Sequence, residues 1–331
     1  MKNRESSIDI SKTLAIILVI YAHVASDDML PKVYVFSFAM SLFFFLSGLF
    51  LKYRPDMTWA DTRSVLVKRF WSLIVPYFIW ACLYTTLSWK HFYYILYGSW
   101  ASLHKSGTSS ALWFLVALFC AICIVQLVFL VFAKCHITRK AYFYLVTILL
   151  FAVGYAFPHP AAGIPWEFDV AIMAAGFLML GYLCRDIVFR TAHLSGIKLS
   201  VLFLLFLVAL IVAGTALLDP HRLVMFANAD YGPISTFLLM SALGTVTFLL
   251  LAMLLDKMFH QGIIKDMLVY CGQITLPIFL LHKFWRELAY DIFSRLHWNY
   301  YTILSSVVVV LFVFMASALT YYIYDKTLRK K

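Results

Sequence analysis

The chain has 331 residues, of which 63% are hydrophobic and 13% are charged, and its formal net charge is +11. Soluble globular domains are about 45–50% apolar and about 25% charged, so this composition excludes a soluble protein and predicts an integral membrane protein. Basic loops that face anionic lipid account for the positive charge, so we expect membrane lipid and no nucleic acid among its partners.

Apolar runs long enough to cross a bilayer follow one another along the whole chain, since a membrane helix needs about 20 residues. The alternating pattern of outer-membrane β-strands is missing, which leaves helices as the spanning structure. The sequence therefore predicts an all-α, polytopic transmembrane helical bundle, with residues 1–331 forming one integral membrane domain. The ten expected spans lie near 8–26, 35–52, 67–88, 111–133, 141–157, 168–187, 198–217, 233–256, 267–289 and 302–324.

Basic residues set the orientation of these spans. With ten spans both termini share a side, and that side would hold 19 of the 27 Lys and Arg residues, against seven on the other side and Lys12 within the first span. The positive-inside rule therefore places both termini in the cytoplasm. Six cysteines are present, and Cys120 and Cys123 are the one pair with CxxC spacing. No second pair of His or Cys ligands lies near them, so we expect neither a disulfide framework nor a metal site.

The first span carries three ionisable residues, which is costly at membrane depth. Asp9 and Lys12 are three residues apart, so they share a helix face and can pair. His23 follows Lys12 by eleven residues, or about 16 Å along a helix. Asp27 comes one turn later and could orient the His23 ring. The alternative is that Lys12 extends to the interface and His23 is an ordinary hydrogen-bonded residue there.

The next two spans carry weaker signals. In "FSFAMSLFFFLSGLFLK", residues 36–52, the small residues Ser47 and Gly48 predict a close approach of two helices. In "VKRFWSLIVPYFIW", residues 67–80, Lys68 and Arg69 are typical of cytoplasmic anchoring. They also have the chemistry of a phosphate site, because Arg binds phosphate oxygens bidentately and Lys supplies a point charge.

A second group of candidates is expected near the outer face. Trp113 begins an inward-running span, Asn228 and Tyr231 lie in the loop before residue 233, and His282 follows a kink expected at Pro277. Aromatic rings with amide and carboxylate groups suit a sugar, although interfacial tryptophans and ordinary loops have the same composition.

Taken together, these stretches resemble acyltransferase family 3, the integral-membrane O-acyltransferases, and most closely its fucose 4-O-acetylase-like branch. The matching pieces occur in family order and cover nearly the whole chain. They are Asp9-x-x-Lys12 followed after ten residues by His23, "FSFAMSLFFFLSG", "KRFWSLIVPYFIW", "LWFLVALF" and "TLPIFLLHKF". The chain departs from the branch at four positions. Ala39 stands where the branch usually has His, and Pro is usual at the other three, Ser41, Val116 and Lys283.

The resemblance implies transfer of an acyl group, usually acetyl, from cytoplasmic acyl-CoA to a sugar hydroxyl of an envelope or exported polysaccharide. It also implies a multi-pass protein of the bacterial inner membrane that uses acetyl-CoA as a co-substrate and no tightly bound cofactor. By this likeness His23 is catalytic, Lys12 and Arg69 serve the donor, and the glycan or lipid-linked glycan acceptor meets the protein at the outer face.

The residue layout fits that chemistry. The CoA phosphates would lie beside Lys12, with which Asp9 forms an ion pair, and beside Lys68 and Arg69. His23 would take the proton of the sugar hydroxyl. Covalent transfer through an acyl-histidine is the alternative. The oxyanion donor is left open among Trp113, Tyr21 and a cation, with Asn228, Tyr231 and His282 as further acceptor-side candidates.

Two other classes remain. A multi-span transporter or flippase for a glycan or lipid-linked glycan would more naturally have repeat symmetry and broken helices with polar groups near mid-membrane. Here the ionisable residues cluster near the two faces and no repeat is visible. The second of these classes is a purely structural partner protein without enzymatic activity.

Overall fold

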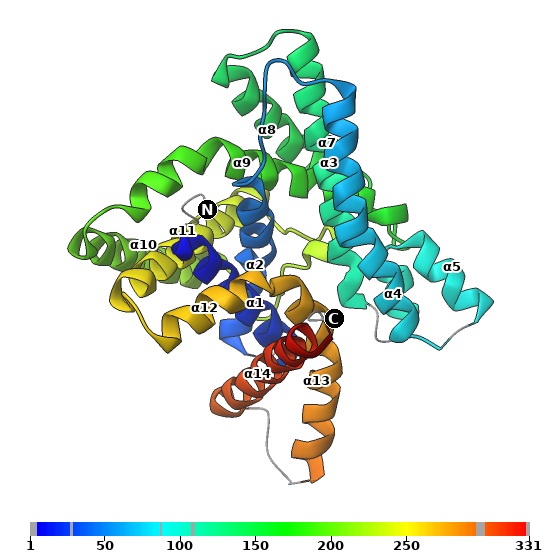
Figure 1. Ribbon diagram of the computed structural model, residues 1–331, viewed down its shortest axis with the longest axis vertical. Coiled ribbons are helices and arrows are strands. Elements are labelled where there is room, and N and C mark those ends of the chain that lie inside the picture. Colours follow the sequence, from blue (N-terminus) through cyan, green and yellow to red (C-terminus); the bar gives the residue numbers. More distant parts are fainter. Residues whose placement is uncertain (1–4, 27–28, 87, 107–109, 296–301, 329–331) are drawn as a thin grey trace. The chain divides into compact units, whose positions relative to one another are not determined.

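A computed structural model describes residues 5–26, 29–86, 88–106, 110–295 and 302–328. Within these ranges the chain is helical almost throughout, and extended backbone pairs only in an isolated bridge between Met225 and Asp230. The predicted all-α fold is therefore confirmed (Figure 1). The α-helices are α1 (Ser6–Val24), α2 (Leu30–Gly48), α3 (Trp59–Arg69), α4 (Val75–Leu83), α5 (Trp89–Tyr97), α6 (Trp100–Lys105), α7 (Trp113–Lys134), α8 (Lys140–Ala156), α9 (Phe168–Ala192), α10 (Gly196–Leu217), α11 (Ile234–Met258), α12 (Ile263–Gln273), α13 (Thr275–Arg295) and α14 (Ile303–Leu328).

Eight helical segments of the described chain are long and apolar enough to cross a bilayer. Helices α12 and α13 would make a ninth span together, but they are bent by 87° relative to each other. Helix α8 has 17 residues, fewer than the roughly 20 that cross the hydrocarbon core without adjustment. All ten predicted runs thus fold as helices, while ten as the number of spans stays a prediction.

The break between α12 and α13 falls at Ile274, before the kink expected at Pro277. Proline has no N–H and its ring collides with the carbonyl four residues back, so it is tolerated in a first turn rather than inside a helix. Pro277 is accordingly found in the first turn of α13, and the chain bends ahead of it. The hydroxyl of Thr275 donates to the carbonyl of Gly272 at 2.7 Å, which satisfies an acceptor left over at the end of α12.

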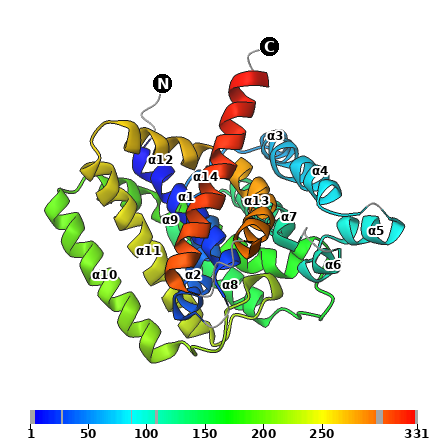
Figure 2. The same ribbon diagram turned by 90° about the horizontal axis from the view of Figure 1, so that it is seen from below.

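The chain divides into two compact units, and the first comprises Met1–Phe43, Ile187–Val224 and Gly232–Lys331. Its centre is α1, which packs against α11, α12, α13 and α14 (Figure 1 and Figure 2). Ile10, Ile16 and Ile20 of α1 are fully buried. The buried residues of α1 also include Ser7, Asp9 and Thr13. Polar and ionisable side chains in membrane segments face the interior of the bundle rather than lipid, which explains the central place of α1.

The second unit comprises Phe44–Asp186 and Met225–Tyr231. Here α3 continues through a π-helical turn, Phe70–Ile74, into α4. The approach predicted at Gly48 is confirmed, because a Cβ on this residue would lie 2.1 Å from the carbonyl oxygen of Leu178 in α9. Glycine therefore lets α2 and α9 meet backbone to backbone.

Candidate functional site

The predicted pair near the start of α1 is present. The Nζ atom of Lys12 lies 3.2 Å from Oδ1 of Asp9, and the Asp9 side chain is 2% exposed while that of Lys12 is 23% exposed. Asp9 lies in the first turn, where the helix dipole favours a negative charge. The buried carboxylate thus holds a cation whose head still reaches the surface.

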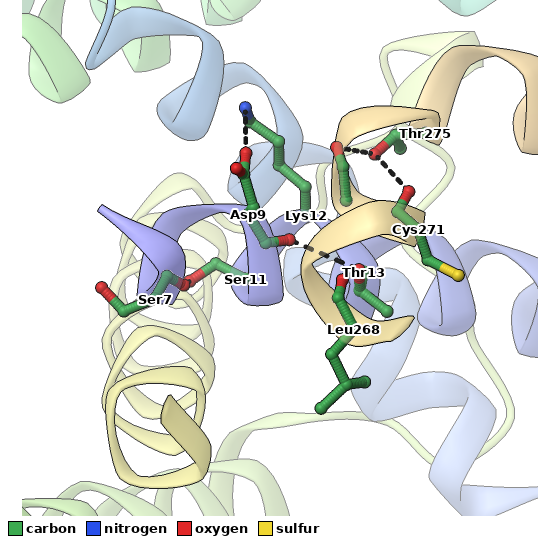
Figure 3. Close-up of polar contacts among 9 residues, drawn as sticks. Ser7, Asp9, Ser11, Lys12, Thr13, Leu268, Cys271 and Thr275 are labelled. Carbon is green, nitrogen blue, oxygen red and sulfur yellow. Dashed lines mark hydrogen bonds and ion pairs between the residues drawn. The ribbon is translucent and has the colours of Figure 1, made fainter. Parts of the chain in front are cut away.

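Helix α12 fixes this end of α1 (Figure 3). The hydroxyl of Thr13 donates to the carbonyl of Leu268 at 2.6 Å. A Cβ on Gly272 would lie 1.9 Å from the carbonyl oxygen of Asp9, far inside any allowed contact. Only glycine lets the two backbones come this close, so the position of the Asp9–Lys12 pair depends on α12.

Near the other end of α1, His23 lies against His282 of α13. Their ring centroids are 5.2 Å apart and the ring planes are inclined by 32°. His23 is half-buried and His282 is buried. The sequence identified both residues as candidates, but for different roles, so their pairing is a finding of the structure.

The hydrogen bonds of His282 define its tautomer. Its Nδ1 atom lies within hydrogen-bonding distance of the carbonyl oxygen of Phe279. A carbonyl can only accept, so Nδ1 carries a proton, and in the neutral ring Nε2 has a lone pair. That Nε2 atom is buried and has no hydrogen-bond partner within the described residues. It can therefore accept a proton or a hydrogen bond from the neighbouring His23 or from a ligand.

Three side chains cap the last carbonyl groups of α1 and so fix the backbone that carries His23. Arg286 Nη1 donates to the carbonyl of His23 at 3.3 Å, Tyr290 donates to that of Val24 at 3.0 Å, and Lys32 donates to that of Ala25 at 2.7 Å. These carbonyls have no partner inside the helix. Two of the three donors are cations, which the negative end of the helix dipole favours.

Arg286 was not among the residues singled out from the sequence. Its Nη2 also donates to the carboxylate of Glu287, while its Nε–H is buried and has no partner within the described part of the chain. This leaves a charged N–H donor beside the His23 backbone. One sequence feature could have identified Arg286: it follows His282 by four residues, which places both residues on one face of α13.

The second unit holds the other basic candidates. Lys68 and Arg69 end α3 directly before the π-helical turn, where Lys68 is exposed and Arg69 is half-buried. Single π-turns inside α-helices are frequent at functional sites. Asp27, expected near His23, lies outside the described residues.

The remaining candidates of the second unit gather around Phe226. The ring of Trp113 stacks on it with centroids 6.2 Å apart, and Tyr231 meets it edge-on at 5.3 Å. Asn228 belongs to the same short 3₁₀ helix, Phe226–Asn228. The structure therefore brings Trp113, Asn228 and Tyr231 into one cluster, whereas His282 pairs with His23. In the described residues no three His, Cys, Asp or Glu side chains are arranged to hold a metal ion.

Comparison with known protein families finds one relationship. A family model described as an acyltransferase domain matches residues 5–325. A comparison with curated proteins finds no match. The family match includes every candidate residue named above, in both units. Because it covers nearly the whole chain, the protein belongs to acyltransferase family 3, as the resemblance of its sequence motifs indicated.

Proposed function

We propose that this protein is a membrane O-acetyltransferase that moves an acetyl group from cytoplasmic acetyl-CoA to a sugar hydroxyl of an envelope or exported polysaccharide. The family supplies the reaction class. The donor, the acceptor and a place in the bacterial inner membrane are parts of the proposal that rest on the resemblance to acyltransferase family 3, and the cytoplasmic side of the donor rests on the positive-inside pattern.

One observation carries the proposal: α1 has a Lys–Asp ion pair near its first end, and near its other end His23 lies beside His282. Lys12, held by Asp9, suits the phosphates of CoA. His23, beside His282, suits the role of a general base, because a neutral imidazole has a lone pair that can take the proton of a hydroxyl group. Eleven residues separate Lys12 from His23, about 16 Å along the helix axis, a span that the extended pantetheine arm of CoA would bridge.

The proposed reaction needs no external oxidant or reductant. His23 takes the proton of the acceptor hydroxyl, and the alkoxide oxygen forms a bond to the thioester carbonyl carbon. The tetrahedral intermediate collapses with cleavage of the carbon–sulfur bond. The CoA thiolate then receives the proton from the imidazolium, which restores the neutral ring. His282 would orient His23 through its Nε2 lone pair.

Arg286 is our proposed oxyanion donor and takes the place of the unspecified cation among the candidates left open by the sequence. Its Nε–H is buried, has no partner within the described residues and belongs to the group that also binds the His23 carbonyl. Preorganised donors of this kind stabilise the charge that develops on the carbonyl oxygen without reorganisation.

The decisive experiment measures transfer and donor binding separately in purified protein. His23→Ala should lower acetyl transfer to the polysaccharide by about 10²–10⁴-fold, the usual contribution of a general base, while acetyl-CoA still binds. His260→Ala is the matched control, because His260 is exposed in the connection before α12. If the polysaccharide stays fully acetylated with His23→Ala, the mechanism is wrong.

One observation favours the transporter alternative, namely the 87° break between α12 and α13. Broken helices form substrate sites in many transporters. Here, however, the hydroxyl of Thr275 satisfies a carbonyl at the break and Gly272 packs on α1, so the bend has a structural reason. A measurement of acetyl-CoA binding separates the two functions. An acetyltransferase should bind acetyl-CoA, whereas a flippase should not.

A further inference from the structure

The second unit contains a cavity of about 300 Å³ with several polar side chains in its wall, at the lower end of the range of ligand pockets, roughly 300–1,000 Å³. Its polar lining comes from Trp100 at the start of α6, His159 in the connection after α8, Glu167 and Asp169 at the start of α9, and Asn228. All of these residues lie in connecting segments or at the helix ends next to them. The predicted topology places these segments on the side of the membrane opposite to the chain termini. An extracytoplasmic acceptor would reach this side.

Two carboxylates are buried in the wall of this cavity. Glu167 is 2% exposed and Asp169 is 3% exposed. Asp169 Oδ2 lies 3.3 Å from His159 Nδ1, whereas Asp169 Oδ1 and His159 Nε2 are buried without a hydrogen-bond partner in the described chain. Buried polar atoms without partners destabilise a fold. Their presence beside a cavity indicates that something else satisfies them.

Hydrogen bonds join the segments that form this wall. The Trp100 backbone N–H donates to the Glu167 carboxylate, and the Ser99 hydroxyl donates to the carbonyl of Ala162 at 2.8 Å. Trp166 and Glu167 both have positive φ angles, 62° and 54°. Residues other than glycine rarely adopt this left-handed backbone conformation. Strained backbone of this kind persists where the surrounding structure holds it, often at ligand sites.

Tyr231 completes the surroundings of His159. Its ring meets the His159 ring edge-on, with centroids 6.3 Å apart. Burial, followed by the negative charges of Asp169 and Glu167, raises the pKa of the Tyr231 phenol well above its usual value. The phenol therefore keeps its proton and carries no negative charge.

We propose that this cavity binds one sugar residue of the acceptor, with Asp169 and Glu167 accepting hydrogen bonds from hydroxyl groups and His159 and Asn228 interacting with other hydroxyls. The site rests on the proposed function and specifies its acceptor side. Trp100 also lines the cavity, and its ring is stacked on His104 with centroids 4.9 Å apart. The cavity thus presents donors and acceptors, the combination that a neutral polyhydroxyl compound needs.

Other ligands fit less well. An ammonium group would need acceptors alone, whereas the side-chain amide of Asn228 also presents a donor. A divalent cation would need several convergent ligands, and the described residues include no group of three metal-binding side chains. The mixed set of groups favours a sugar over either cation.

Saturation-transfer NMR on the purified full-length protein tests the proposal with defined probes, the methyl glycosides of glucose, galactose and fucose. At least one should bind saturably at millimolar concentration. Asp169→Asn keeps the shape of the side chain and removes its charge, and should weaken that binding about tenfold, since charged acceptors make the stronger hydrogen bonds. Asn228→Ala, at an exposed position, should weaken it as well and is less disruptive to folding.

Asp219→Asn is the matched control and should bind the glycosides as the wild type does. Asp219 is an exposed carboxylate in the connection after α10 and does not line the cavity. Equal binding by the wild type, Asp169→Asn and Asn228→Ala would overturn the proposal. So would an absence of binding by all three glycosides, or displacement of a bound glycoside by Ca²⁺ alone.

Acetyl-CoA binding, measured on the same samples, separates this proposal from the proposed function. If the wild type binds none of the glycosides while its acetyl-CoA binding is intact, only the acceptor site is contradicted. Sugar binding without any acetyl-CoA binding or thioester consumption would instead contradict acetyl transfer and leave a sugar-binding cavity.

Discussion

Gly272 of α12 lies against the backbone of Asp9 in α1, so close that a Cβ at position 272 would be 1.9 Å from the Asp9 carbonyl oxygen and 2.5 Å from its carbonyl carbon. The atoms in the way are backbone atoms, which cannot turn aside as the end of a side chain can. The position of the Asp9–Lys12 pair therefore depends on the absence of a side chain at position 272.

Gly272→Ala should accordingly destabilise the protein, because α12 must move away from α1 and weaken the Thr13–Leu268 hydrogen bond. We expect a loss of about 1–3 kcal/mol or more, as for other overpacked cores. The melting temperature of the purified protein is the readout. Gly196→Ala is the control, since no atom lies within 4 Å of a Cβ at that position. Similar melting temperatures for both variants would contradict the packing argument.

Replacing Arg286 should slow the chemical step more than it weakens donor binding. Arg286→Gln removes the charge beside His23, and we expect kcat to fall about 10²–10³-fold, the usual effect of losing an oxyanion donor. Arg286→Lys keeps the charge without the planar fork and should recover part of the rate. Arg295→Gln on the same helix is the control, because its side chain is 77% exposed and pairs with Asp291. An unchanged kcat in Arg286→Gln would exclude this role.

The cation near the start of α1 should recognise the phosphates of CoA and nothing else in the donor. Lys12→Gln should raise the KM for acetyl-CoA about tenfold, since a charge-assisted hydrogen bond contributes roughly 1.5–3 kcal/mol. The KM for acetyl-pantetheine, which lacks the nucleotide phosphates, should not change. Lys265→Gln is a matched control, because Lys265 pairs with Asp256 at 2.9 Å and its side chain is 22% exposed. Equal effects of Lys12→Gln on both donors would show that Lys12 does not bind phosphate.

The part of the site that is local in sequence could be predicted. Asp9 and Lys12 are three residues apart on a helix, and helical geometry alone brings them together. His23 and His282 could each be recognised, because ionisable residues in apolar segments are costly and therefore suggest a role. The bend near Pro277 was expected, but it falls at Ile274, since the proline is accommodated in the first turn that follows.

The amino-acid sequence by itself determined that this is an all-α membrane protein with a charged pair at the start of its first helix, because composition and helical period act within a single segment. Only the tertiary structure decided that His23 meets His282, that Arg286 caps the helix that carries His23, and that Glu167 and Asp169 line a cavity with Asn228. These contacts join residues far apart in the chain, and they depend on how helices and their connecting loops pack, which no local pattern encodes.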